Sequence, residues 1–199
     1  MNKQKIAIVG AGTVIFKDEG VGVFAQKYLD LNYKFYLKKN DEKSNESADV
    51  TIVDGGVLGF QLMVYYQEYD KVIILDTITM QDDKAGSIYN LPADKLLGLG
   101  SYKQTAHEVE IVEMLEICSL LENFAETNII GIVPDDIASV VTDLSDTLKA
   151  QFYNFIQETI NELKRAGINS IQNETIISLE EIINSYANPT AQRDLAHLK

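Results

Sequence analysis

Near its N-terminus the chain reads IAIVGAGTVIFKDEGVG, from Ile6 to Gly22. Its opening residues form an apolar run of strand length, and after Glu19 apolar side chains recur at helical spacing. A strand that leads through a turn into a helix is the first unit of an α/β sheet. The pair Asp18-Glu19 is therefore expected at the carboxyl end of the first strand, the edge of an open α/β sheet where ligands bind.

The rest of the chain alternates between short apolar strands and amphipathic helices. Further strands are expected over residues 33–37, 50–53, 71–76, 86–91 and 128–133, the first of them as an edge strand. Helices are expected over residues 19–29, 57–68, 107–121, 146–166 and 175–186. This alternation predicts an α/β fold, a three-layer α/β/α arrangement around a mainly parallel, twisted sheet.

One domain is expected over residues 1–170, followed by a C-terminal helical extension and polar tail over residues 171–199. The length of the chain suits a single α/β domain. Residues 38–49 are almost all polar, which is typical of a mobile surface loop. Ser145, just ahead of the long helix at 146–166, is of a residue type that caps helix N-termini.

A strongly acidic composition narrows the classes of partner. The formal net charge is −13, so phosphate backbones and anionic membranes should repel the chain, while its 46% hydrophobic residues allow a substantial core.

No apolar run approaches the ~18 residues of a membrane span, and no signal-peptide pattern opens the chain, so a cytoplasmic location is expected. The single cysteine, Cys118, lies in a predicted amphipathic helix and is expected in the core, not as a catalytic thiol.

Three residues with metal-binding side chains are expected near the same edge of the sheet. They are Glu19 after the first strand, Asp76 at the end of the strand over 71–76, and His107 in the first turn of a later helix. Two carboxylates and an imidazole suit borderline divalent metals such as nickel or zinc, and three ligands leave a position for substrate or water. Asp54, followed by Gly55 and Gly56, ends a neighbouring strand and could line this site without binding metal.

Each of these residues also has a purely structural interpretation. An acidic residue such as Glu19 is common in a first helical turn, Asp76 suits a turn after a strand, and a first-turn histidine such as His107 needs no ligand. A dinucleotide site is a further alternative, but Ile15 stands where its third glycine is required and Lys17-Asp18-Glu19 would set two negative charges beside a pyrophosphate. No serine or cysteine nucleophile elbow is present.

Five short motifs, in order along the chain, resemble those of the nickel–iron hydrogenase maturation endopeptidases. They are Gly10-x-Gly12 with Asp18-Glu19-Gly20-Val21-Gly22-Val23, then Val53-Asp54-Gly55-Gly56, Ile73-Ile74-Leu75-Asp76-Thr77, Ala106-His107, and Gly131-Ile132-Val133-Pro134-Asp135-Asp136 with Leu144-Ser145. The resemblance extends from Lys5 to Gly167. One departure is Glu110, where the family often has a glycine three residues after the histidine.

The resemblance implies a processing endopeptidase that removes a C-terminal peptide from the hydrogenase large-subunit precursor after nickel insertion. Glu19, Asp76 and His107 would be its metal-binding and catalytic residues, and Asp54, Gly55 and Gly56 would contact the substrate. The nickel would arrive with the precursor, and either the metal or a carboxylate would activate water, so an aspartyl-type and a metal-dependent mechanism both stay open. A module that docks a metal-loaded precursor without cleaving it is the alternative function.

Overall fold

The computed structural model describes residues 4–37, 47–57, 59–79, 83–93 and 124–188. The expected helix over 107–121, with His107 and Cys118, lies outside these residues, as does most of the polar segment expected to form a loop. None of the described helices is both long and apolar enough to cross a membrane.

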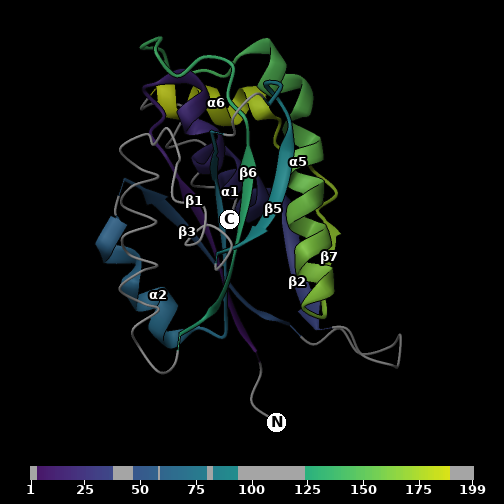
Figure 1. The fold of residues 1–199 in the computed structure, drawn as a ribbon. Helices are drawn as coiled ribbons and strands as arrows, with labels where there is room; N and C mark the ends of the chain where they lie inside the picture. The colour runs from purple at the N-terminus through teal and green to yellow at the C-terminus, as the bar shows by residue number, and fades with distance from the viewer. Residues whose placement is uncertain (1–3, 38–46, 58, 80–82, 94–123, 189–199) are drawn as a thin grey trace.

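A five-stranded sheet forms the centre of the molecule (Figure 1). Its order is β3 (Asp49–Gly56), β1 (Lys5–Ala11), β4 (Lys71–Thr77), β6 (Glu126–Ile132) and β5 (Ile88–Pro92). The first four strands are parallel and β5 is antiparallel to β6. The prediction of a mainly parallel sheet is therefore confirmed.

Alternate residues of the central strands face two separate apolar clusters. Ile6 and Ile8 of β1 pack with α1 (Val21–Asn32), α5 (Asp146–Arg165) and α6 (Leu179–Ala187), whereas Ala7 and Val9 pack with the segment that contains α2 (Met63–Glu68). This follows from the two-residue repeat of a strand, which sends successive side chains to opposite faces. Because both faces are covered by helices, the fold is the expected three-layer α/β/α arrangement (Figure 1).

Several elements differ from those expected. Helix α1 begins at Val21 after a 3₁₀ turn, Lys17–Gly20, and α2 is preceded by another 3₁₀ turn, Gly59–Leu62. Strand β2 (Tyr33–Leu37) lies outside the main sheet, where it pairs antiparallel with β7 (Ile168–Gln172), a strand that the sequence did not predict. Helix α6 begins four residues later than expected because Ser178 and Glu181 form a capping box at its start.

The N-terminus expected for α5 is confirmed. The Ser145 hydroxyl oxygen accepts a hydrogen bond from the Leu148 backbone N–H at 3.3 Å, the usual N-cap contact. The helix buries one apolar stripe: Leu148, Phe152, Phe155, Ile156 and Leu163. These side chains hold α5 against α1 and the sheet.

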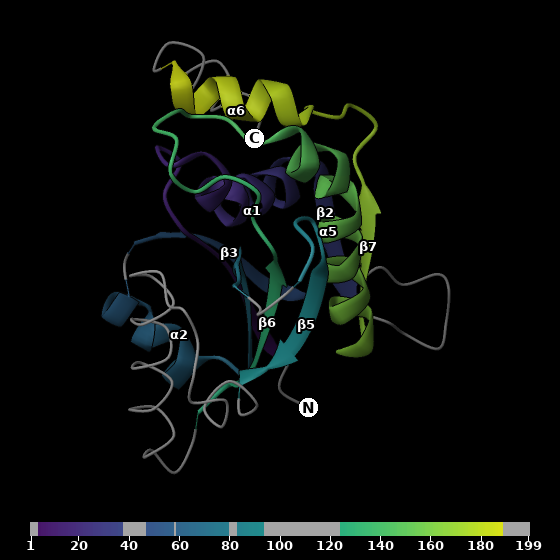
Figure 2. The ribbon, with the colours of Figure 1, turned by 45° about the horizontal axis from the view of Figure 1, so that its top comes forward.

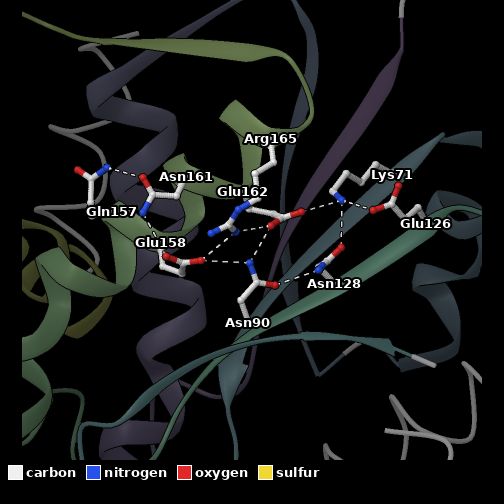
Figure 3. Close-up of polar contacts among 9 residues, drawn as sticks. All are labelled: Lys71, Asn90, Glu126, Asn128, Gln157, Glu158, Asn161, Glu162 and Arg165. Carbon is white, nitrogen blue, oxygen red and sulfur yellow. Dashed lines mark hydrogen bonds and ion pairs between the residues drawn. The ribbon is translucent and has the colours of Figure 1, made fainter. Parts of the chain in front are cut away.

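An ionic network holds the second half of α5 to the amino ends of β4 and β6 (Figure 3). The Lys71 ammonium lies 2.8 Å from Glu162 Oε1 and 2.6 Å from Glu126 Oε1, and it donates to Asn128 Oδ1 at 3.0 Å. The side chains of Lys71 and Glu162 are only 4% and 6% exposed. Two charges this deeply buried are stable only while each keeps its partner.

The same network includes strand β5 through Asn90. Its amide donates to Glu162 Oε2 at 2.7 Å and to Glu158 Oε1 at 3.2 Å, and its oxygen accepts from Asn128 at 2.9 Å. Arg165 also donates to both glutamates from the surface. Burial alone would raise the pKa of Glu162, but the bonds from Lys71, Arg165 and Asn90 outweigh it and lower that pKa, which keeps the carboxylate charged.

We predict that Lys71→Met lowers the free energy of unfolding by about 3–5 kcal/mol, because it leaves the buried Glu162 charge without its buried partner. Urea unfolding measures this loss. Arg165→Met is the matched control: it also removes a cation from Glu162, but Arg165 is 58% exposed, so its loss should cost less than about 1 kcal/mol. Equal losses in the two variants would show that burial does not govern the network.

Candidate active site at the carboxyl edge of the sheet

Helix α1 begins directly over the carboxyl ends of β1 and β4. A Cβ atom at Gly22, in the first turn of α1, would overlap the backbone carbonyl oxygens of Leu75 and Ala11. Only glycine permits this approach, because any side chain would push the helix away from the sheet. The 3₁₀ turn that carries Glu19 is therefore held at the end of β4, next to Asp76.

Gly12 lies between the two acidic residues expected in the site. It follows β1 with a φ of 112°, a conformation that L side chains rarely adopt. A Cβ atom on Gly12 would overlap the carbonyl oxygen of Glu19 and would lie 3.7 Å from Asp76 Oδ1. The structure thus brings the backbone of Glu19 close to the Asp76 side chain at the sheet edge, and both residues are buried there.

Asp76 is held in place at the end of β4. Its Oδ1 accepts a hydrogen bond from the Thr77 backbone N–H at 2.7 Å, and it lies beside Gly131 of β6 in the strand register. With only 3% of its surface exposed, this carboxylate is more enclosed than a turn aspartate after a strand usually is. Such burial is typical of a carboxylate with a specific task.

Asp54 lies two strands away from Asp76 on the same edge. In the register of β1 and β3, Gly10 pairs with Asp54 but Ala11 pairs with Gly56, so Gly55 is the extra residue of a β-bulge. The Gly56 carbonyl oxygen accepts from the Gly12 N–H at 2.9 Å. Bulges are frequent beside active sites because they redirect the backbone. Here the bond from Gly12 to Gly56 connects the segment after Asp54 to the turn after β1, next to Glu19 and Asp76.

Asp18 has a structural role that the sequence did not reveal. Its side chain is fully buried and accepts three backbone N–H bonds, from Asp135 at 2.9 Å, Asp136 at 2.8 Å and Ser145 at 2.6 Å. It therefore holds both ends of the loop between β6 and α5 against the 3₁₀ turn. In the sequence Asp18 is visible only as an acidic residue immediately before Glu19. Nothing in the local pattern predicts that its carboxylate binds the backbone of a distant loop.

A second set of contacts fixes the same two loops. Lys17 adopts a φ of 43°, uncommon for a residue with a side chain, and it is held there by its N–H bond to the Val141 carbonyl oxygen and by an ion pair of 2.8 Å with Asp136. Lys17, with Ser139, holds the pKa of the Asp136 carboxyl well below its usual range. Local strain of this kind clusters at functional sites.

The two loops carry an apolar patch to the surface beside Glu19. The patch consists of Ile15, Phe16, Val140 and Val141, and a β-bridge between Phe16 and Val141 holds its halves together. Val140 is 75% and Ile15 51% exposed. Apolar side chains held in contact with water by a fixed backbone are typical of a binding surface.

The structure does not describe His107, so the third member of the expected metal-binding triad stays a prediction. Among the described residues, no group of three or more His, Cys, Asp or Glu side chains is placed to hold a metal ion. The dinucleotide alternative gains no support from the turn after β1: the Gly12 N–H bonds to Gly56, and the α-helix starts only at Val21.

Comparison with known proteins gives one consistent family. The sequence model of the hydrogenase maturation protease family matches residues 35–162, more than half of the chain. The Hydrogenase 2 maturation protease of Escherichia coli is 22% identical over 174 residues, covering 87% of this chain and 99% of that protein. Protein HydD of Wolinella succinogenes is 26% identical over 151 residues, covering 72% and 89%.

Solved structures show the same fold. The hydrogenase maturating endopeptidase HybD from E. coli superposes with a TM-score of 0.73 at 21% identity, over 85% of this chain and 98% of its own. The [NiFe] hydrogenase maturation protease HybD from Thermococcus kodakarensis gives a TM-score of 0.60 at 22% identity, over 82% and 99%. From the family match, the chain belongs to the hydrogenase maturation protease family.

Proposed function

We propose that this protein is the endopeptidase that removes the C-terminal extension of a nickel–iron hydrogenase large-subunit precursor once nickel has been inserted. Family membership supports the class of reaction. The observation that carries the proposal is that two buried acidic residues lie next to Gly12 at the carboxyl edge of the sheet: Glu19, through its backbone carbonyl, and Asp76, through its carboxylate. Parallel α/β sheets bind their ligands at this edge.

In this proposal Glu19, Asp76 and His107 ligate the nickel that the precursor carries. Two carboxylates and one imidazole form a weak site for nickel compared with one rich in thiolates, so the enzyme does not extract the metal from its substrate. Binding through the metal would place the scissile peptide bond next to the same residues. Hydrolysis then requires activation of one water molecule, by the metal or by a carboxylate.

The proposal gives the apolar patch a role in docking. Ile15, Phe16, Val140 and Val141 flank the turn that carries Glu19, so an apolar surface of the precursor would cover them as its metal reaches the site. Asp54, Gly55 and Gly56 are proposed to contact the precursor on the other side of Gly12. Because Asp18 fixes both loops, the docking surface is formed before the substrate arrives.

We predict that the enzyme shortens nickel-loaded precursor and spares nickel-free precursor. Glu19→Gln and Asp76→Asn should each lower kcat/KM by at least about 100-fold, because the metal and the scissile bond would lose their position. Intact mass of the precursor C-terminus reports the cleavage. Glu68→Gln, an exposed carboxylate at the end of α2, is the control and should cleave normally.

Three results separate the alternatives. Equal cleavage of loaded and empty precursor would contradict recognition through nickel. Binding of loaded precursor without any change in its mass would favour the docking module over the peptidase. Unfolding of Glu19→Gln, seen by circular dichroism, would assign Glu19 to the start of the helix and not to the chemistry.

We also predict that Val140→Glu raises KM for the precursor about 10-fold and leaves kcat unchanged, because a charge would be buried where an apolar surface docks. Steady-state kinetics with loaded precursor measure both constants. Val64→Glu on α2 is the matched control, since Val64 is also exposed but lies in the segment that covers the opposite face of the sheet. The same KM for both variants would remove the patch from the docking surface.

A further inference from the structure

The C-terminal helix α6 places a phenol against Asp54. The Tyr186 hydroxyl donates to Asp54 Oδ2 at 3.2 Å and accepts from the Gln26 amide nitrogen at 3.4 Å. These three side chains come from α6, β3 and α1, elements that are distant in the sequence. Figure 2 shows α6 lying across the end of the molecule next to α1.

Packing against α1 fixes the position of the Tyr186 ring. It meets Phe24 of α1 edge to face, with ring centroids 5.5 Å apart and an interplanar angle of 72°. Helix α6 itself is anchored by Ile182, which is fully buried in the core shared with α1 and α5. The hydroxyl of Tyr186 is therefore held over the end of β3 and is not a mobile surface group.

The environment keeps this hydroxyl a donor. Burial, followed by the nearby charge of Asp54, raises the pKa of Tyr186 well above that of an ordinary tyrosine. The phenol stays protonated at neutral pH, so it can donate to a charged carboxylate, the stronger class of hydrogen bond. Asp54 in turn has one oxygen engaged by Tyr186 and the other on the side of Gly56, where a Cβ atom would lie 3.8 Å from Oδ1.

Asp54 is connected to the candidate active site by a short path. Gly56, two residues on, accepts the N–H bond of Gly12, and Gly12 adjoins Glu19 and Asp76. Asp54 and Tyr186 also line a cavity of about 240 Å³ between α1, β3 and α6, which is large enough for part of a peptide side chain. The Asp54 carboxylate therefore lies where a bound precursor would be, and its orientation would affect how the precursor binds.

We propose that Tyr186 is a positioning residue for precursor recognition: its hydroxyl fixes the Asp54 carboxylate so that Oδ1 accepts a hydrogen bond from the precursor chain. The inference rests on the proposed function and deepens it, because it assigns α6 a part in the site. Gln26 assists by donating to the phenol oxygen, which orients the Tyr186 proton toward Asp54. A carboxylate held in one orientation binds with less loss of side-chain freedom than one that must be ordered by the substrate.

The test is a double-mutant cycle with Tyr186→Phe and Asp54→Ala. Tyr186→Phe keeps the ring against Phe24 and removes only the hydroxyl, so we expect a KM for loaded precursor about 10-fold higher, with kcat nearly unchanged. In the Asp54→Ala background, which removes the acceptor of the Tyr186 hydroxyl, the same substitution should have no further effect on KM. A residue with a merely structural role would lower activity by the same factor in both backgrounds.

Tyr69→Phe is the matched control. The Tyr69 hydroxyl likewise donates a hydrogen bond to a side chain of β3, to Thr51 at 3.0 Å, but this contact is partly buried and lies three residues before Asp54. It should leave KM unchanged. Thermal melting of the three single variants should agree to within a few degrees, which confirms that the fold is intact.

A second readout does not depend on cleavage. Tyr186→Phe should shift the backbone amide NMR signals of Gly55 and Gly56 in the free protein, and in the Asp54→Ala background it should shift them much less. If wild-type protein does not cleave the precursor, the proposed function fails while this cycle still reports the coupling. Unshifted signals in Tyr186→Phe, or equal KM changes in both backgrounds, would overturn the positioning role.

Discussion

The close approach of α1 to β1 and β4 is the constraint on which the rest of the carboxyl edge depends. Gly22 lies against the carbonyl oxygens of Ala11 and Leu75 with no space for a side chain, and Gly12 passes under the carbonyl of Glu19 in the same way. Backbone therefore packs on backbone where a layer of side chains would otherwise stand. This is the reason that a residue of the first loop, Glu19, lies beside a residue of the fourth strand, Asp76.

Two neighbouring carboxylates do different work at this edge. Asp18 points into the protein and accepts three backbone N–H bonds from the loop between β6 and α5, so its charge serves the geometry of that loop. Glu19, one residue later in the same 3₁₀ turn, lies with Asp76 at the proposed site. Successive residues of a tight turn project in different directions, so Asp18 can brace the turn while Glu19 takes the role proposed for it in the site.

The two edges of the sheet are stabilised by different means. At the amino ends of β4 and β6, side chains bind one another in the network around Lys71 and Glu162 (Figure 3). At the carboxyl edge the buried carboxylates Asp18 and Asp76 bind backbone N–H groups, and the partly exposed ion pair of Lys17 with Asp136 adds a contact between side chains. A carboxylate that binds backbone N–H groups fixes the path of the chain without requiring a second side chain as its partner.

Local sequence patterns were sufficient for the layers of the fold. The apolar runs at β1, β4 and β6, the N-cap at Ser145 and the apolar stripe of α5 all lie where the periodicity predicted, because strand and helix spacing depend on near neighbours. Motif order along the chain also located Glu19, Asp54 and Asp76 at one edge, since parallel strands end together. The sequence also identified the family, because the five motifs that resemble it occur in order along the chain.

Other features depended on partners that are remote in the chain. Strand β7 pairs with β2, more than a hundred residues away in the sequence. The alternation of apolar and polar residues over its own five residues is too weak to predict a strand. The task of Asp18 appears only when Asp135, Asp136 and Ser145 turn their N–H groups toward it, and the contact of Tyr186 with Asp54 exists only because α6 folds back over α1. A hydrogen bond has a direction and a length that chain spacing does not contain, so these assignments belong to the tertiary structure alone.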